Sequence, residues 1–317
     1  MKLKATYPKE SLGFLCQLFG YSRQSYYGRK EVSFIKEVME GFVLDYVRSI
    51  RSQAPRLGCE KLYLMVKEHF KEDLNMGRDA FYKLLRTHDL MLKKRKYRVI
   101  TTNSRHRYKK YPNLIKELDI HFVNQVWVSD ITYILTDNGV CYLTLITDAY
   151  SHRVMGWNIG PSLETIHVLK ALKMAVAQLP TGVKPIHHSD RGTQYCSDLY
   201  VTFLTKHVGQ ISMTDNGDPL ENAVAERMNG ILKQEWLYTS TCKDMKDAIR
   251  QTKAAIDFYN TQRPHRSIDM MTPEQAYNYK GNIERRWKNY YKKETEYLDV
   301  ENKCVSFADA DKTMATY

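Results

Sequence analysis

Three carboxylates occupy positions where an acidic side chain needs a chemical reason. Asp130 lies within the run VWVSDITYIL, among residues typical of a strand, where a buried charge is costly unless it is paired or binds a cation. Asp190 follows the short run PIHHS, and α/β proteins present their ligands at the carboxyl ends of strands. Glu226 belongs to a predicted helix and has no evident capping role. These positions make the three carboxylates candidates for a functional site.

The helix that carries Glu226 contains a second candidate feature. The segment DPLENAVAERMNGILKQEW predicts an N-cap at Asp218, with Pro219 in the first turn and Glu221 completing a capping box. Glu221 is therefore assigned a structural role. A polar stripe on one face of a helix usually faces solvent. This pattern alone therefore does not distinguish a solvated surface from a functional site. The residues of this polar stripe are Asn222, Glu226, Asn229 and Lys233.

The elements around these carboxylates predict an α/β domain. Three β-rich runs come first, separated by turn-like residues, and they predict an antiparallel meander. A long helix, a strand that ends at Asp190, a shorter helix, a further strand and another long helix follow. This order favours an α/β fold with a mixed sheet. The predicted strands span residues 126–135, 141–151, 153–160 and 210–214, and the first two helices span 163–179 and 198–206.

The charge of the 317-residue chain is concentrated in its first part. Residues 1–125 hold 26 Lys and Arg against 13 Asp and Glu, a net of +13. The remaining residues hold 22 against 23, so the overall net charge of +12 comes from the N-terminal part. Such asymmetry favours a basic module for a polyanion such as nucleic acid, with a solvated basic surface as the alternative.

Residues 1–90 are predicted to be helical, with helix-turn-helix spacing. A first helix ends near Gly20, and Ser22 caps a second, short helix that begins with Arg23. A further set of amphipathic helices follows over residues 33–90, and its last member carries Arg78. Both groups fit a DNA-binding bundle, although an ordinary helical domain has the same pattern.

A basic linker is predicted over residues 91–122. Nine of the eighteen residues from 93 to 110 are Lys or Arg, a density that resists packing into a core. Cations spaced along an extended chain can follow phosphates, whereas a solvated linker would have no such role. The proposed contacts are Lys93, Lys94, Arg95 and Lys96.

Two absences in the sequence bear on its surroundings. The six cysteines are far apart with no CxxC pair, which favours reduced thiols in a cytoplasmic setting. No run of eighteen apolar residues exists, so no membrane partner is expected.

The carboxylates and their surroundings resemble a known family. Asp130 in WVSDITYI, Asp190 in HHSDRGTQY and Glu226 in ENAVAERMNGILKQE resemble the DDE core of transposases and retroviral integrases. Thirty-five residues separate the last two, and Lys233 fits the same pattern. The segment YNTQRPHRSIDMMTPEQAY resembles the tail of OrfB-type transposases of the bacterial family named after insertion sequence three. The likeness covers roughly residues 30–280, and the lack of an HHCC zinc pattern argues against a retroviral integrase proper.

This resemblance implies an RNase H-like catalytic core over residues 123–280, followed by a tail over 281–317. It implies that Asp130, Asp190 and Glu226 hold two Mg²⁺ ions, with Mn²⁺ as a substitute, because Mg²⁺ prefers oxygen ligands. Water would cut the DNA, and the freed 3′-OH would attack a second phosphodiester. The implied partners are the double-stranded terminal repeats of an insertion sequence, target DNA and further copies of the chain. The proposed DNA contacts outside the linker are Lys233, Asn222, Arg23, Arg78, Arg263 and Arg266.

Several alternatives accompany this hypothesis. The chain could be a DNA-binding regulator with a degenerate core, or an RNase H-type nuclease acting on RNA–DNA hybrids. His187 and His188 invite a zinc site, but strand neighbours point to opposite faces, so we expect one to be packed and one to lie near the substrate. Asp148 could be a fourth carboxylate, although a turn role is favoured.

Overall fold

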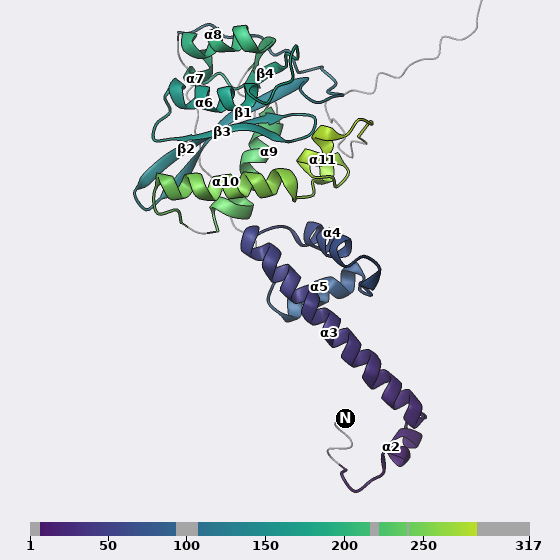
Figure 1. Ribbon diagram of the computed structural model, residues 1–317. Coiled ribbons are helices and arrows are strands. Elements are labelled where there is room, and N and C mark those ends of the chain that lie inside the picture. Colours follow the sequence, from purple (N-terminus) through teal and green to yellow (C-terminus); the bar gives the residue numbers. More distant parts are fainter. Residues whose placement is uncertain (1–6, 93–106, 216–221, 240, 284–317) are drawn as a thin grey trace, which may run out of the picture.

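The computed structural model describes residues 7–92, 107–215, 222–239 and 241–283 (Figure 1). A helical N-terminal part precedes an α/β core, and its long helix projects away from that core (Figure 1). The five cysteines within the described ranges are free thiols. Across these ranges, no helix combines the length and the apolar character needed to cross a membrane.

A five-stranded mixed sheet forms the centre of the core, in the order β3-β2-β1-β4-β5. The first three strands pair antiparallel, whereas β1 pairs with β4, and β4 with β5, in parallel. The predicted meander and mixed sheet are therefore confirmed, and the topology is that of an RNase H-like core. The strands are β1 (Val126–Thr136), β2 (Gly139–Asp148), β3 (Val154–Gly160), β4 (Ile186–Ser189) and β5 (Gln210–Met213).

Helices cover both faces of this sheet (Figure 1). One face packs against α6, α7 and α8 through a cluster that includes Trp127, Ile146 and Met155. The opposite face packs against α9, η3 and α10 through a cluster that includes Leu143 and Leu145. The bounds are α6 (Thr165–Val176), α7 (Thr193–Cys196), α8 (Asp198–His207), α9 (Ala223–Leu232), the π-helix η3 (Lys233–Leu237), α10 (Met245–Thr261), η4 (Arg266–Ile268) and α11 (Pro273–Asn278).

The N-terminal part differs from its prediction in one respect. Ser22 does cap a helix, since its side chain accepts a hydrogen bond from the backbone of Ser25 at 3.0 Å. The predicted short helix is wrong, however, because α3 continues without a break for 31 residues, from Arg23 to Gln53. The preceding turn passes through Gly20, whose φ of 72° suits glycine. The remaining helices are α2 (Leu12–Leu18), α4 (Cys59–Phe70), η1 (Lys71–Asp73) and α5 (Arg78–Thr87).

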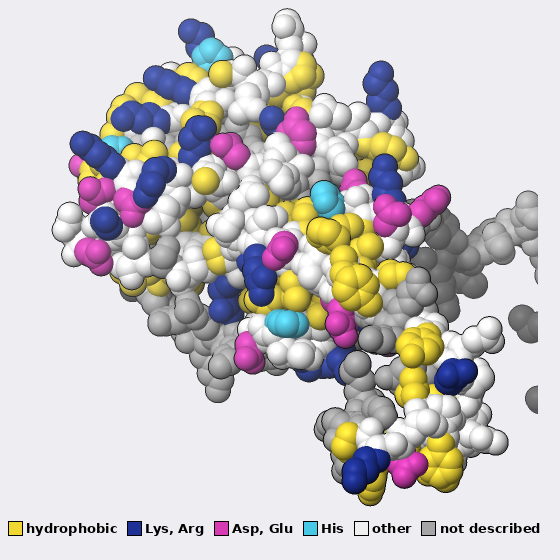
Figure 2. All heavy atoms as spheres, turned by 60° about the horizontal axis from the view of Figure 1, so that its bottom comes forward, with side chains coloured by type: hydrophobic (Ala, Val, Ile, Leu, Met, Phe, Trp, Pro, Cys, Tyr) yellow, Lys and Arg dark blue, Asp and Glu magenta, His cyan; other side chains and the backbone are white. Residues whose placement is uncertain are grey.

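The C-terminal half of α3 packs against the other helices of the helical part and against the core. Val43 and Val47 are fully buried together with residues of α4 and α5, and they join the same hydrophobic cluster as α9 and α10. Phe34 and Ile35, in the N-terminal half, are by contrast more than half exposed. Figure 2 shows hydrophobic side chains on the forward-facing N-terminal end of the molecule. The helical part is therefore joined to the core at one end of α3.

The segment from residue 107 to 122 packs against the core although it was predicted to be linker. The backbone N–H of Leu114 donates to the Ser212 hydroxyl at 2.9 Å, which fixes the segment beside β5. Ile115, Leu118 and Ile120 pack on a small cluster around β1. The described half of the predicted linker thus belongs to the core, and residues 93–106 lie outside the described part of the chain.

Candidate active site

The two aspartates are brought together by the register of two parallel strands. Ser129 of β1 pairs with Ser189 of β4, so Asp130 and Asp190 occupy equivalent positions directly after this pair. Partners in register on parallel strands direct their side chains to the same face of a sheet. Asp130 and Asp190, sixty positions apart in the sequence, therefore lie next to each other at one end of the sheet.

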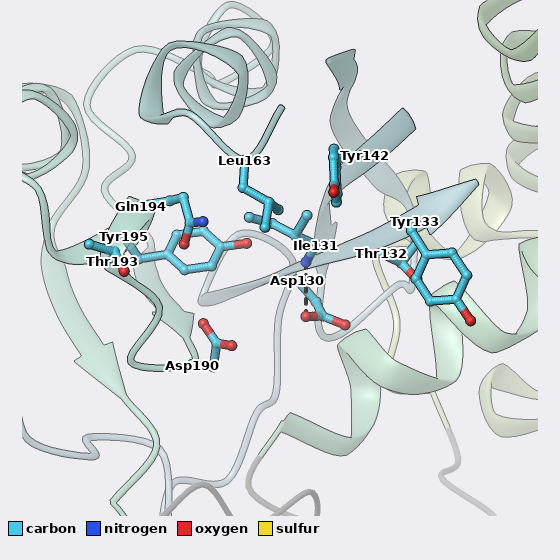
Figure 3. A pocket seen from close by; sticks show the side chains of 10 residues that line it. All are labelled: Asp130, Ile131, Thr132, Tyr133, Tyr142, Leu163, Asp190, Thr193, Gln194 and Tyr195. Carbon is cyan, nitrogen blue, oxygen red and sulfur yellow. Dashed lines mark hydrogen bonds between the residues drawn. The ribbon is translucent and has the colours of Figure 1, made fainter. Parts of the chain in front are cut away.

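Both aspartates line one pocket of about 110 Å³ at this end of the sheet (Figure 3). Asp130 enters from β1 and Asp190 from the loop after β4, on either side of a gap (Figure 3). The Asp190 carboxylate accepts a hydrogen bond from the backbone N–H of Gly192 at 3.0 Å, which orients it toward the pocket. The lining consists of Asp130, Ile131, Thr132, Tyr133, Tyr142, Leu163, Asp190, Thr193, Gln194 and Tyr195.

The polar stripe of α9 faces this pocket and not open solvent alone. The Asn229 amide donates to Asp130 Oδ2 at 2.7 Å, and Asn229 is buried. Glu226 lies one helical turn earlier on the same face of α9 and is exposed. Its carboxylate raises the pKa of Asp130, which places the two groups in the same local field. The sequence identified the stripe, but it did not identify Asn229 as a contact of Asp130.

Lys233 ends the same stripe and approaches the same aspartate. Its Nζ lies 3.9 Å from the ring centroid of Tyr133, a residue of the pocket wall. Burial lowers the pKa of Lys233 to about 8, and the negative charge of Asp130 partly offsets this effect. A half-buried ammonium group beside a pocket with several carboxylates is suited to receive a phosphate.

The electrostatics of the pocket fit a divalent cation. Burial raises the pKa of Asp130 to about 7, repulsion from Asp190 and Glu226 adds to this effect, and hydrogen bonds from Asn229 and the backbone of Ile131 oppose it. Repelling oxygen ligands of this kind suit Mg²⁺, which takes few protein carboxylates and keeps waters or phosphate oxygens. Among the described residues, no three His, Cys, Asp or Glu side chains converge closely enough to hold one ion together.

The two histidines do not belong to this site. His187 and His188 are both fully buried, so the expectation that one lies near the substrate is wrong. His187 Nε2 hydrogen-bonds with the Tyr200 hydroxyl at 3.0 Å, and His188 Nδ1 with the Ser212 hydroxyl at 2.8 Å. Burial lowers the pKa of His187 to about 3, so its ring is neutral and structural.

Asp148 has the structural role that was favoured for it. Its carboxylate accepts hydrogen bonds from the backbone N–H and the hydroxyl of Ser151, both at 2.7 Å, and from the backbone N–H of Asn124 at 2.6 Å. It is fully buried and closes the turn between β2 and β3. A fourth catalytic carboxylate is therefore not found at this position.

Two of the proposed DNA contacts are engaged inside the protein. Arg263 is 1% exposed and forms two hydrogen bonds with Glu235, at 2.6 and 2.7 Å, so it has no accessible group for a phosphate. Asn222 is buried at the start of α9 and donates to the Ser129 carbonyl at 3.2 Å. Their sequence motifs gave no indication of these partners, which lie 28 and 93 residues away.

The other proposed contacts are accessible or lie outside the described ranges. Arg23 and Arg78 are exposed at the first residues of α3 and α5, and Arg266 is exposed beside Glu60 at 4.0 Å. Arg78 also pairs with its neighbour Asp79 at 3.1 Å. Lys93, Lys94, Arg95 and Lys96, together with the predicted capping residues Asp218, Pro219 and Glu221, are not among the described residues.

Tyr195 is a pocket residue that the sequence did not single out. It is almost fully buried on α7, and Figure 3 shows its hydroxyl directed into the pocket. Its hydroxyl and that of Ser129, the residue before Asp130, lie 3.0 Å apart. Ser129 also donates to the Leu145 carbonyl at 3.2 Å. These contacts anchor α7 to the strand that carries Asp130.

Comparison with known proteins gives consistent matches over this region. Two family models, each described as an integrase core domain, match residues 121–219 and 208–273. The insertion element IS600 31 kDa protein of Shigella sonnei, described as uncharacterized, is 34% identical over 265 residues, which are 82% of this chain and 96% of that protein.

Two transposases are similar over shorter stretches. The transposase for IS629 of Shigella sonnei is 35% identical over 48% of this chain and 51% of its own length. The transposase InsF for IS3A of Escherichia coli K12 is 34% identical over 49% and 54%, respectively. This chain thus spans about half the length of both transposases. Among solved structures, the HTLV-2 integrase catalytic core in complex with magnesium matches with a TM-score of 0.40 and 20% identity, over 49% of this chain and 97% of that one.

Proposed function

Since this chain belongs to the IS3 family of insertion-sequence transposases with a DDE integrase core, we propose that Asp130, Asp190 and Glu226 are its metal-binding catalytic residues. Its activity is that of a DDE transposase, a polynucleotidyl transferase that acts on DNA. A DNA-binding regulator and an RNase H-type nuclease are not favoured by these relatives. The observation that supports the assignment is the parallel register that sets Asp130 beside Asp190, with Glu226 one helical turn before Asn229, the α9 residue that donates to Asp130.

The proposed cofactors are two Mg²⁺ ions, for which Mn²⁺ can substitute. Asp130 is the carboxylate best placed to bind both ions, because the negative charges of Asp190 and Glu226 both act on it. Bound divalent ions would supply activation of the attacking oxygen and stabilisation of the leaving oxygen in an in-line displacement. No covalent nucleophile from the protein is needed for such a reaction.

The remaining side chains prepare and position the reactants. Asn229 holds the Asp130 carboxylate in one orientation through its 2.7 Å hydrogen bond, so less rearrangement is needed when ligands arrive. Lys233, held against the Tyr133 ring, would contact the phosphate next to the scissile bond and keep it in line for attack. Leu163 and Ile131 form an apolar wall on one side of the pocket.

The proposed substrates are the terminal repeats of the chain's own element and a target duplex. The region up to residue 90 is proposed to bind the element ends, and the basic segment beyond it to follow the DNA backbone, because the positive charge of the chain is concentrated there. Two element ends must be joined to one target, so we propose that the active form is an oligomer assembled on DNA. A bacterial cytoplasmic setting is proposed with it.

The test is strand transfer with the full chain, DNA carrying the repeats that flank its own gene, and Mg²⁺ or Mn²⁺. We expect joined products that require the divalent ion, and we expect Mn²⁺ binding measured by calorimetry to be lost in Asp130→Ala. Joining without a divalent ion, or unchanged Mn²⁺ binding in this variant, would contradict the assignment of the site.

A further inference from the structure

A π-helix begins at the lysine of the active site. The backbone N–H of Tyr238 donates to the Lys233 carbonyl at 2.8 Å, five residues earlier, where an α-helix would bond four residues earlier. One extra residue in a helix changes the direction of the following side chains by about 100°. Side chains after Lys233 are therefore aimed at a different part of the molecule from those before it.

This change of direction connects two regions. Lys233 faces Tyr133 and the field of Asp130 in the pocket. Glu235 and Trp236, two and three residues later, face the N-terminal helical part, whose end lies against η3. A segment of five residues thus touches the catalytic pocket at one end and the proposed DNA-end-binding part at the other.

Glu235 makes the first connection to the helical part. Its carboxylate accepts from Arg263 Nη2 and Nε at 2.6 and 2.7 Å, and Lys61 Nζ of α4 lies 3.9 Å away. Its backbone carbonyl accepts from the N–H of Arg56, just beyond α3, at 3.1 Å. Arg263 belongs to the core, whereas Lys61 and Arg56 belong to the helical part, so Glu235 is bonded to both.

Trp236 makes the second connection. Its indole Nε1 donates to the carbonyl of Gln53, the last residue of α3, at 2.8 Å. The final carbonyls of a helix have no partner within the helix, so this bond satisfies a group that the helix itself leaves open. The Trp236 ring is buried and packs near Phe258 of α10, with centroids 6.0 Å apart. The end of α3 is therefore fixed to η3 by a directed bond.

We propose that η3 is a strap through which Trp236 and Glu235, acting as positioning residues, set Lys233 and Glu226 according to the placement of α3. This inference rests on the proposed function, and it adds that binding of an element end by the helical part aligns the catalytic side chains. Hydrogen bonds hold Glu235 and Trp236 at one end of the strap, and contact with the Tyr133 ring holds Lys233 at the other, so a displacement of α3 reaches the pocket. A misplacement of about 1 Å at a reacting centre can reduce a rate by about 100-fold.

The decisive variant is Trp236→Phe, which keeps an aromatic ring and removes the Nε1–H donor. Strand transfer in a single turnover is measured on two saturating substrates: a duplex with the whole terminal repeat, and a duplex truncated to the base pairs next to the cleavage point. We expect the rate on the long duplex to fall about tenfold while the rate on the short duplex stays at the wild-type value. The affinity for the long duplex, measured by fluorescence anisotropy, should not change.

Two further variants separate positioning from general stability. Trp157→Phe makes the same chemical change in β3, where the Trp157 side chain packs on the hydrophobic cluster, and it should leave both rates unchanged. Glu235→Gln keeps the shape of the side chain and should reproduce the selective loss on the long duplex, with a lower melting temperature because the buried Arg263 loses its counter-charge. An unchanged long-duplex rate in Trp236→Phe, or an equal fall on both duplexes with a lower melting temperature, would overturn the inference. A wild-type chain that joins neither duplex would instead refute the proposed function.

Discussion

Two acidic sites lie at opposite ends of one helical segment, and they are neutralised in different ways. In the pocket, burial and the negative charges of Asp190 and Glu226 raise the pKa of Asp130 to about 7. At the joint with the helical part, Glu235 lies between Arg263 and Lys61. The joint supplies its own counter-charges, whereas the pocket accumulates negative charge. The paired charges of the joint stabilise the fold, whereas the negative charge of the pocket favours the binding of cations.

The same comparison explains why stability and activity should respond oppositely at the two sites. Removing one partner of a buried, hydrogen-bonded ion pair leaves the other charge buried and uncompensated. A carboxylate removed from a cluster of like charges relieves repulsion and costs little stability. Substitutions can therefore separate the two sites experimentally.

The largest effect is expected in the pocket. Asp130→Ala, Asp190→Ala and Glu226→Ala should each reduce cleavage and joining by about 1,000-fold or more, because each change forfeits several kcal/mol of metal-dependent stabilisation. DNA binding, measured by anisotropy, should remain, and the melting temperature should not fall. Asp257→Ala on α10, an exposed carboxylate paired with Lys253, is the control and should match the wild type. Retained activity in Glu226→Ala would mean that another carboxylate completes the site.

The second effect concerns the joint. Arg263→Ala should lower the free energy of unfolding by about 3–5 kcal/mol, because it leaves Glu235 buried without its bidentate partner. Denaturant titration measures this change. Arg266→Ala, an exposed neighbour, is the matched control and should change the same quantity by less than about 0.5 kcal/mol. A stable Arg263→Ala protein with a weaker dependence of DNA binding on salt would restore Arg263 as a DNA contact.

A smaller effect is expected at Lys233, which lies between the two sites. Lys233→Ala should slow strand transfer by about 10- to 100-fold at saturating DNA and Mg²⁺, because the phosphate loses a contact that keeps it in line. Lys233→Arg should retain part of the rate, since the charge survives while the geometry changes. Lys253→Ala, an exposed lysine on α10, provides the comparison. A Lys233→Ala rate equal to that of the wild type would leave this lysine as surface.

The smallest effect per residue is expected in the basic segment that precedes the core. Replacing Lys93, Lys94, Arg95 and Lys96 by alanine should weaken binding to all DNA sequences alike. The log–log dependence of affinity on salt should flatten by up to about 0.9 for each phosphate contact that is lost. Titrations at several salt concentrations, with a specific and an unrelated duplex, measure both quantities. An unchanged slope would exclude these residues from the interface.

The sheet and the two aspartates were accessible to sequence reasoning because they leave local signals. Alternating apolar residues mark β1, and a charge at the exit of a short strand marks Asp190. Periodicity also placed Glu226, Asn229 and Lys233 on one face. Only the fold could show that this face meets Asp130, because the decisive hydrogen bond joins residues 99 positions apart.

The errors arose where tertiary contacts override local preference. A short helix was predicted after Ser22, separate from the helices that follow residue 33, yet α3 continues through this region from Arg23 to Gln53. One of His187 and His188 was expected to be packed and the other to lie near the substrate. Both are buried instead, because Tyr200 and Ser212 supply hydrogen-bond partners for them. The π-helix has no sequence signature, because the contacts that stabilise it come from segments distant in the sequence.

Under the proposal that the region up to residue 90 binds the element ends, the length of α3 sets a distance along the DNA. Thirty-one residues rise about 46 Å along the helix axis, whereas one turn of B-form DNA rises about 34 Å. A base pair read near Arg23 would therefore lie more than one turn of the double helix away from the point where the other end of α3 meets η3. Shortening or lengthening α3 would change both the distance and the rotational phase between the recognised and the cleaved base pairs. We therefore expect the spacing between the recognised and the cleaved base pairs to match the length of α3.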